Sequence, residues 1–270
     1  MTITIAKIFE PKNRHIPIII SVPHAGTEFP EEVVSQFRTQ HLSAPEDTDW
    51  FVDLLYSFAL EMGATLVKAN LSRYVIDLNR SPKQEKLYND TRQQTELCPT
   101  KTFNGEDLYN ENCKPGEDEV AKRLKNYYWP YYAFLQNVIS EIQEDFSHAL
   151  VFDAHSIKRH VESIQVEPFP DMILGDNNGV TSHPSLKDAA WEVLKDSGYK
   201  VSYNHPFKGG HISRYWGQPD KKIHALQLEM SQDIYMDEFN TKYSEEKAGE
   251  VQKTLRNMLM NLHSAVMRLK

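Results

Sequence analysis

Short apolar runs alternate with longer amphipathic stretches from one end of the sequence to the other, and few fold classes are compatible with that order. Residues 18–22 form a run rich in β-branched side chains between Pro17 and Pro23, which is typical of a buried central strand. Further apolar runs predict strands at residues 64–69, 74–78, 149–152, 172–174, 200–203 and 223–228. Helical spacing of apolar residues predicts helices at 47–62, 117–145 (kinked or divided at Pro130), 185–197 and from 245 onward. We therefore expect an α/β fold in which helices flank a mixed, largely parallel sheet.

The organisation along the chain is simple. Because no internal repeat, low-complexity tract or Gly/Ser/Pro-rich linker divides the sequence, we expect one catalytic domain over residues 1–270. Residues 81–116 are polar and contain several prolines and glycines, which predicts a long excursion over the surface. Such excursions often carry function.

Composition excludes several classes of protein. The 30 Lys and Arg residues against 38 Asp and Glu residues give a net charge of −8, which argues against general nucleic-acid binding. No apolar run approaches the roughly 20 residues that cross a bilayer, and residues 1–10 do not resemble a signal peptide. Only two cysteines occur, Cys98 and Cys113, so a disulfide framework is excluded. We expect a cytoplasmic protein without nucleic-acid or membrane partners.

Ionisable side chains follow several predicted strands, and ligands of open α/β sheets bind beyond the carboxyl ends of the strands. His24 comes just after the strand at 18–22, His155 just after 149–152, and Glu229 directly after 223–228. The sequence Asp-Leu-Asn-Arg at residues 77–80 ends the strand predicted at 74–78. Two imidazoles, a carboxylate and an Asn-Arg pair are therefore predicted to meet at one edge of the sheet.

Two histidines and a carboxylate, with no cysteine, are typical of a catalytic zinc site. Zinc lowers the pKa of a bound water from roughly 15.7 to about 7, and a further carboxylate can carry the proton to a leaving amine. His24 and His155 are the predicted ligands, although each alone could be a core or loop histidine. Asp153, beside His155, is either a residue that orients the imidazole or a turn residue.

The third ligand has three candidates. We prefer Asp47, whose place at the start of a predicted helix equally suits a residue that caps the free N–H groups. Asp49 lies two residues further on, and Glu28 lies four residues after His24.

Cationic side chains near the same edge suggest recognition of an anion. Arg80 with Asn79 could grip a substrate carboxylate, because a guanidinium binds carboxylates in a bidentate manner. Alternatively, Arg80 is a surface residue paired with Asp77. Arg73 is a second candidate cation before the same predicted strand.

The loop at residues 204–211 contains two adjacent glycines, Gly209 and Gly210, whose backbone could approach a ligand closely. Lys208 precedes them, and we expect these three residues to contact substrate. The default interpretation of His205 and His211 is that of solvent-exposed loop residues. The aromatic side chains at 127–132 have helical spacing and are expected to pack in the core.

Taken together, the motifs resemble the N-formylglutamate amidohydrolase family. The resemblance runs from about residue 15 to 236 and rests on the segments Ser21–Thr27, Asp47–Trp50, Ser72–Arg80, Asp153–Ser156, Phe207–Gly210 and Ala225–Met230. It implies a zinc-dependent amidohydrolase that releases formate and L-glutamate from N-formyl-L-glutamate in histidine degradation, with metal-bound water as the nucleophile. It also implies a relation to zinc carboxypeptidase-like folds.

The resemblance assigns roles to the candidate residues. It implies that Glu229 acts as the catalytic base and that Arg73, Asn79 and Arg80 hold a small anionic N-acyl amino acid. In the order of a ligand His, an Asn-Arg pair, a second ligand His and a catalytic Glu, the sequence follows the carboxypeptidase pattern, but no Glu stands three residues after His24. His211 also follows the double glycine where a bulkier aromatic residue is expected. The alternatives are a zinc amidohydrolase for another N-acyl amino acid or small peptide, and a non-catalytic homologue that binds metal or carboxylates.

Overall fold

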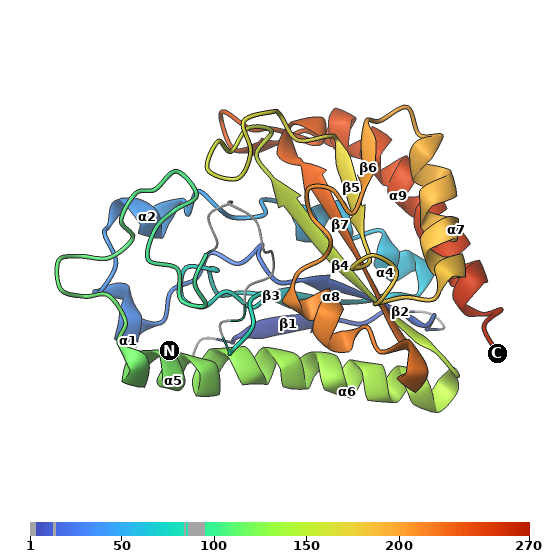
Figure 1. Cartoon of the computed structure of the whole chain (residues 1–270), viewed down its shortest axis with the longest axis horizontal. Coiled ribbons are helices and arrows are strands. Elements are labelled where there is room, and N and C mark those ends of the chain that lie inside the picture. Colours follow the sequence, from blue (N-terminus) through green and yellow to red (C-terminus); the bar gives the residue numbers. More distant parts are fainter. Residues whose placement is uncertain (1–3, 13–14, 84, 86–94) are drawn as a thin grey trace.

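The computed structural model describes residues 4–12, 15–83, 85 and 95–270, and a seven-stranded sheet runs through its centre (Figure 1). The sheet order is β1-β3-β2-β4-β7-β5-β6. Its strands are β1 (Ala6–Phe9), β2 (Ile18–Val22), β3 (Thr65–Ala69), β4 (Ala149–Ile157), β5 (Met172–Gly175), β6 (Val201–Tyr203) and β7 (Ile223–Ser231). The run β3-β2-β4-β7 is parallel, as is the pair β5-β6, whereas β1 and β5 pair antiparallel with β3 and β7. The predicted mixed, largely parallel α/β sheet is confirmed.

Helices cover both faces of this sheet. They are α1 (Glu31–Val34), α2 (Gln40–Ser43), α3 (Val52–Leu55), α4 (Ala59–Met62), α5 (Glu117–Arg123), α6 (Trp129–Asp145), α7 (Pro184–Lys195), α8 (His211–Trp216) and α9 (Glu245–Val266). A π-helical turn, η1 (Leu124–Tyr128), joins α5 to α6, and 3₁₀ turns η2 (Pro219–Lys221) and η3 (Gln232–Ile234) flank β7. A short hairpin of β8 (Met236–Asp237) and β9 (Lys242–Tyr243) precedes α9. None of the helices in the described residues is long and apolar enough to cross a membrane.

The alternation of side chains along β2 explains the two layers. Ile18 and Ile20 belong to a buried cluster with α3, α4, α7 and α9, whereas Ile19 packs into a second cluster with α6 on the opposite face. In Figure 1, α6 lies along one side of the sheet, and α7 and α9 lie on the other. Because both faces are covered, the central strands read as continuous apolar runs.

The helix predicted at 47–62 is wrong in extent. Only α3 and α4 are α-helical, and Phe51 before α3 has a left-handed backbone with φ of 61°. The backbone N–H of Asp49 donates to the carbonyl oxygen of His24 at 3.0 Å, which is a tertiary contact with the end of β2. This bond holds Asp49 beside the end of β2, and the left-handed backbone at Phe51 interrupts the helix.

The strand predicted at 74–78 is also wrong, because these residues form turns and belong to no strand. Their apolar side chains are buried, as the pattern indicated, but two of their carbonyl groups accept hydrogen bonds from side chains. Tyr132 Oη donates to the Leu78 carbonyl oxygen at 2.8 Å, and an Arg123 guanidinium N–H donates to that of Val75 at 2.9 Å. Burial, rather than strand pairing, produced the apolar run.

Other segments differ in detail. The helix at 117–145 is divided, as predicted, with η1 just before Pro130 in the first turn of α6. Within the excursion at 81–116, the described residues contain no strand or helix, only isolated bridges such as that between Lys101 and Asp107, and residues 84 and 86–94 lie outside the described part. Strands β4 and β7 extend further than predicted, so His155 and Glu229 lie within strands. The two residues are partners in the register and lie side by side on neighbouring strands.

Candidate active site

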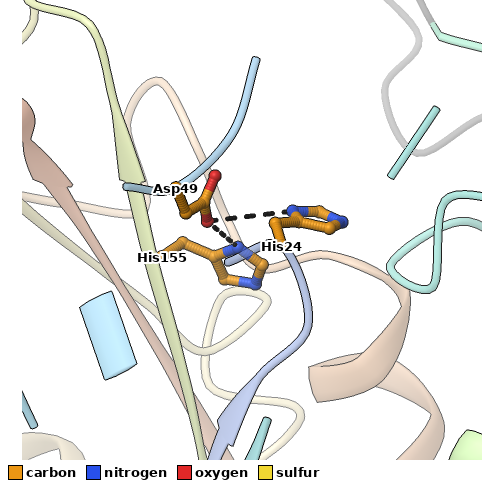
Figure 2. Close-up of side chains that lie close together, drawn as sticks. All are labelled: His24, Asp49 and His155. Carbon is orange, nitrogen blue, oxygen red and sulfur yellow. Dashed lines mark hydrogen bonds and ion pairs between the residues drawn. The ribbon is translucent and has the colours of Figure 1, made fainter. Parts of the chain in front are cut away.

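Three buried side chains, His24, Asp49 and His155, converge at the carboxyl ends of the central parallel strands (Figure 2). One nitrogen from each imidazole and one oxygen of the carboxylate all lie within 4.8 Å of one another. Asp49 Oδ2 lies 2.9 Å from His155 Nδ1 and 3.8 Å from His24 Nδ1. His24 follows β2, His155 lies in the adjacent strand β4, and Asp49 is brought to them by the bond between its N–H and the His24 carbonyl. Two imidazoles and one carboxylate are the ligand set of many catalytic zinc sites.

The preferred third ligand, Asp47, lies outside this group. Its Oδ2 instead accepts a hydrogen bond from the backbone N–H of Phe103 at 2.9 Å, and no helix begins at Asp47 that it could cap. Glu28 is exposed and also lies outside the group. The structure therefore places Asp49, the second of the three candidates, beside the two histidines.

The outer nitrogen of each imidazole is held by a buried carboxylate. His24 Nε2 lies 2.7 Å from Asp77 Oδ1, and His155 Nε2 lies 2.9 Å from Asp153 Oδ2. Such partners fix the ring orientation and tautomer of metal-binding histidines. Both Nδ1 atoms consequently face Asp49. Asp153 thus contacts His155 as the first of its two predicted roles requires, whereas the role of Asp77 towards His24 was missed.

Asp77 is held in its charged form by its surroundings. Burial alone would raise its pKa, but Arg73, His24 and Arg80 outweigh burial and hold the pKa of this carboxyl well below its usual range. Arg73 Nη2 donates to Asp77 Oδ2 at 2.7 Å, whereas Arg80 Nε lies 4.0 Å from the same oxygen. A permanently ionised Asp77 is suited to orient the imidazole of His24.

Glu229 lines the pocket in front of the three-residue group, together with both arginines. Gln227 Nε2 donates to Glu229 Oε2 at 3.3 Å. Burial raises the pKa of Glu229 to about 8, a shift that His155 opposes and the negative charge of Asp49 reinforces. A carboxyl group with a pKa near neutral can both accept and return a proton.

Arg73 and Arg80 both line the pocket, but different residues hold them in place. Arg73 is 7% exposed, is held by Asp77, and lies against the ring of Phe103 with 4.9 Å between guanidinium carbon and ring centroid. Arg80 Nε donates to Thr95 Oγ1 at 2.8 Å. Both line the pocket, as a carboxylate clamp requires.

Asn79 makes several contacts within the protein, whereas a residue that only holds substrate would leave its amide group free. Its Nδ2 donates to Asp153 Oδ2 at 3.2 Å and lies 2.9 Å from His155 Nε2, and its Oδ1 accepts from the Ile212 N–H at 2.7 Å. The amide therefore ties His155 to the start of α8, although Asn79 also lines the pocket.

The glycine loop contributes through Gly210. A Cβ atom at Gly210 would lie 2.5 Å or less from three atoms of the Asn79 side chain, so only glycine fits there. Its N–H donates to Gln227 Oε1 at 2.7 Å, and it lines the pocket. Gly209, with φ of 108°, lies against Ser213, and the Lys208 carbonyl accepts from the Asn177 N–H. Gly210 thus lines the pocket, whereas Lys208 and Gly209 do not line it.

Similarity to known proteins identifies the family of the chain. The family model described as N-formylglutamate amidohydrolase matches residues 16–236. The chain belongs to the N-formylglutamate amidohydrolase family. The N-formylglutamate deformylase of Pseudomonas putida is 38% identical over 249 residues, covering 92% of each chain, and that of Pseudomonas aeruginosa is 38% identical over 228 residues, covering 84% of this chain and 85% of that one.

Solved structures agree with this assignment. The crystal structure of N-formylglutamate amidohydrolase from Ralstonia eutropha JMP134 is 27% identical, with a TM-score of 0.78 over 97% of this chain and 98% of that chain. The product of gene Atu2144 from Agrobacterium tumefaciens shares the fold at 19% identity, with a TM-score of 0.71 over 95% of each chain. The relation to zinc carboxypeptidases stays a prediction.

Several other residues of this amidohydrolase-family chain are now placed. His205 is exposed, as expected, but His211 is half-buried at the start of α8, against Tyr132 and Tyr215. Burial lowers the pKa of His211 to about 4. Among the aromatic residues at 127–132, the tyrosines are buried as predicted, whereas Trp129 is 42% exposed.

Sequence reasoning also missed the apolar wall of the pocket, formed by Phe103, Ile157, Ile164 and Phe207. These residues come from three separate loops and the end of β4. No spacing in the sequence indicates that such loops meet.

Proposed function

We propose that this protein hydrolyses the amide bond of N-formyl-L-glutamate to formate and L-glutamate, with a zinc ion held by His24, Asp49 and His155. The observation that carries the proposal is the joint placement of this ligand group, Glu229 and the two arginines around one pocket. The substrate is proposed from the similarity to relatives that are named N-formylglutamate deformylase.

The donor set fits a divalent metal ion. Both Nδ1 atoms face Asp49, and both Nε2 atoms are held by buried carboxylates, an arrangement that leaves the inner nitrogens available as neutral ligands. Zinc at this site supplies a Lewis acid and lowers the pKa of water towards neutrality.

The chain's own residues do the remaining work. Glu229, which lines the pocket beside the three ligands, takes the proton of the attacking water and returns it to the departing amide nitrogen. Arg73 and Arg80 bind the carboxylates of the glutamate moiety and orient the formyl group towards the three ligands. The apolar side chains of Phe103 and Phe207 line the same pocket.

A substrate panel tests this function. Formate or free amine release is measured with N-formyl-L-glutamate, N-acetyl-L-glutamate, N-succinyl-L-glutamate and an N-formyl amino acid whose side chain is uncharged. We expect kcat/KM to be highest for N-formyl-L-glutamate and to fall when the side-chain carboxylate is removed. Preference for a longer acyl group would instead favour another N-acyl amino acid, and zinc binding without hydrolysis of any member would indicate a non-catalytic homologue.

A further inference from the structure

Asp47 is a partly buried carboxyl group next to the proposed metal site but not part of it. Its Oδ2 accepts from the Phe103 N–H at 2.9 Å, and its own N–H donates to Tyr74 Oη at 3.1 Å. Its carbonyl oxygen accepts from Arg73 Nη1 at 3.5 Å. Asp47 is therefore bonded both to Arg73 and to the residue whose ring covers Arg73.

The bond to Phe103 holds one turn of a loop that is also attached elsewhere, for example by the Leu108 N–H, which donates to the Thr100 carbonyl oxygen, and the Leu108 carbonyl oxygen, which accepts from the Arg38 N–H. In the described residues 95–116 there is no strand, and the turn that carries Phe103 is closed by bonds between Thr102 and Glu106 and between Gly105 and Thr102. A second anchor, from Asn104 to Glu46 at 3.0 Å, is exposed to solvent. The bond to Asp47 is partly buried, so water competes with it less than with the exposed bond to Glu46.

The position of the Phe103 ring matters for Arg73. The ring lies 4.9 Å from the guanidinium carbon, and both side chains line the pocket. A ring over a guanidinium contributes a cation–π attraction and keeps water from that face. Removing water strengthens the attraction between Arg73 and a bound carboxylate, because Coulomb energies rise as the effective dielectric constant falls.

We propose that Asp47 is a positioning residue that seats Phe103 over Arg73 and thereby sets the affinity of the pocket for an anionic substrate. The proposal rests on the proposed hydrolysis of N-formyl-L-glutamate. It differs from a role as metal ligand, because Asp47 acts through a hydrogen bond to a backbone N–H.

The variants Asp47→Ala, Asp47→Asn and Phe103→Ala, with the double variant Asp47→Ala/Phe103→Ala, separate these roles. Zinc content, kcat and KM for N-formyl-L-glutamate are measured for each. Losing one partly buried hydrogen bond predicts a KM increased roughly 5- to 30-fold in Asp47→Ala, with kcat and one equivalent of zinc retained. Asp47→Asn keeps an acceptor oxygen and should approach wild type. The double variant should match Phe103→Ala, because residues that act through one contact are not additive.

The matched control is Asp53→Ala, which removes a carboxylate that pairs with Lys68 at 2.6 Å and does not line the pocket. We expect its KM to match wild type. Loss of zinc in Asp47→Ala, equal damage in Asp47→Asn, or additive effects in the double variant would each overturn the proposal. If Asp47→Ala does not fold, Asp47→Ser, with a shorter acceptor, replaces it in the same comparisons. A wild-type protein that releases no formate would contradict the proposed function, whereas the zinc content of the Asp47 variants would still decide between ligand and positioning residue.

Discussion

Replacing Glu229 by glutamine separates proton transfer from metal binding. Glu229 lines the pocket but is not part of the ligand group His24, Asp49 and His155, so the variant should keep its zinc. The contact from Gln227 Nε2 to Glu229 Oε2 at 3.3 Å can persist, because the amide oxygen of a glutamine also accepts. The change is therefore close to isosteric, and we expect the melting temperature to stay within a few degrees of wild type.

The expected loss is catalytic. Burial raises the pKa of Glu229 to about 8, and its carboxyl group can accept and return a proton. The amide group of a glutamine cannot. General acid–base groups contribute roughly 10²- to 10⁴-fold, which corresponds to about 3–5 kcal/mol of activation free energy. We expect kcat for formate release from N-formyl-L-glutamate to fall by this amount while KM changes little.

The assay measures formate enzymatically alongside zinc by atomic emission. The matched control is Glu250→Gln, an exposed residue of α9 remote from the pocket. A Glu229→Gln enzyme with wild-type kcat would refute the assignment of Glu229 as the proton carrier. Loss of zinc along with kcat would show instead that Glu229 supports the metal.

Three further predictions follow from individual contacts. His24→Ala and His155→Ala should each bind zinc at least 10-fold more weakly, as measured by competition with a chelator, and full retention in both would contradict the proposed site. Gly210→Ala places a methyl group 2.3 Å from Asn79 Nδ2, so we expect a loss of about 1–3 kcal/mol in unfolding free energy, measured by urea titration. Burial lowers the pKa of His224 to about 4, so between about pH 6.5 and 4 the unfolded chain binds a proton that the folded chain does not, and stability should fall by roughly 1–3 kcal/mol as the pH drops through this window. Urea unfolding of His224→Asn should show a shallower fall over the same range, and an unchanged slope would disprove the assignment.

The sheet was predictable because its central strands are buried on both faces. A strand such as 18–22 carries its signal in five consecutive residues, and the helices that cover it carry their own periodicity. The turns at 74–78 were not predictable, since the side chains that bind their carbonyl groups come from more than 40 residues away. Local patterns report burial and do not reveal which partner takes a backbone hydrogen bond.

The candidate site was also predictable only in part. His24 and His155 were predictable from their places after buried strands, and the structure brings them together. Asp47 was preferred over Asp49, and the structure selects Asp49 through a contact that the sequence does not reveal, the bond from the Asp49 N–H to the carbonyl oxygen of His24 in a distant segment. Phe103 gave no signal, because the residues that hold it, such as Asp47 and Arg73, come from distant segments of the sequence.

The measurement that tests the central claim most directly is the metal content of the purified protein, paired with formate release from N-formyl-L-glutamate. The site formed by His24, Asp49 and His155 predicts one equivalent of zinc per chain. Removal of the metal by a chelator should abolish formate release, and one added equivalent should restore it. Full activity in the metal-free protein would contradict the account.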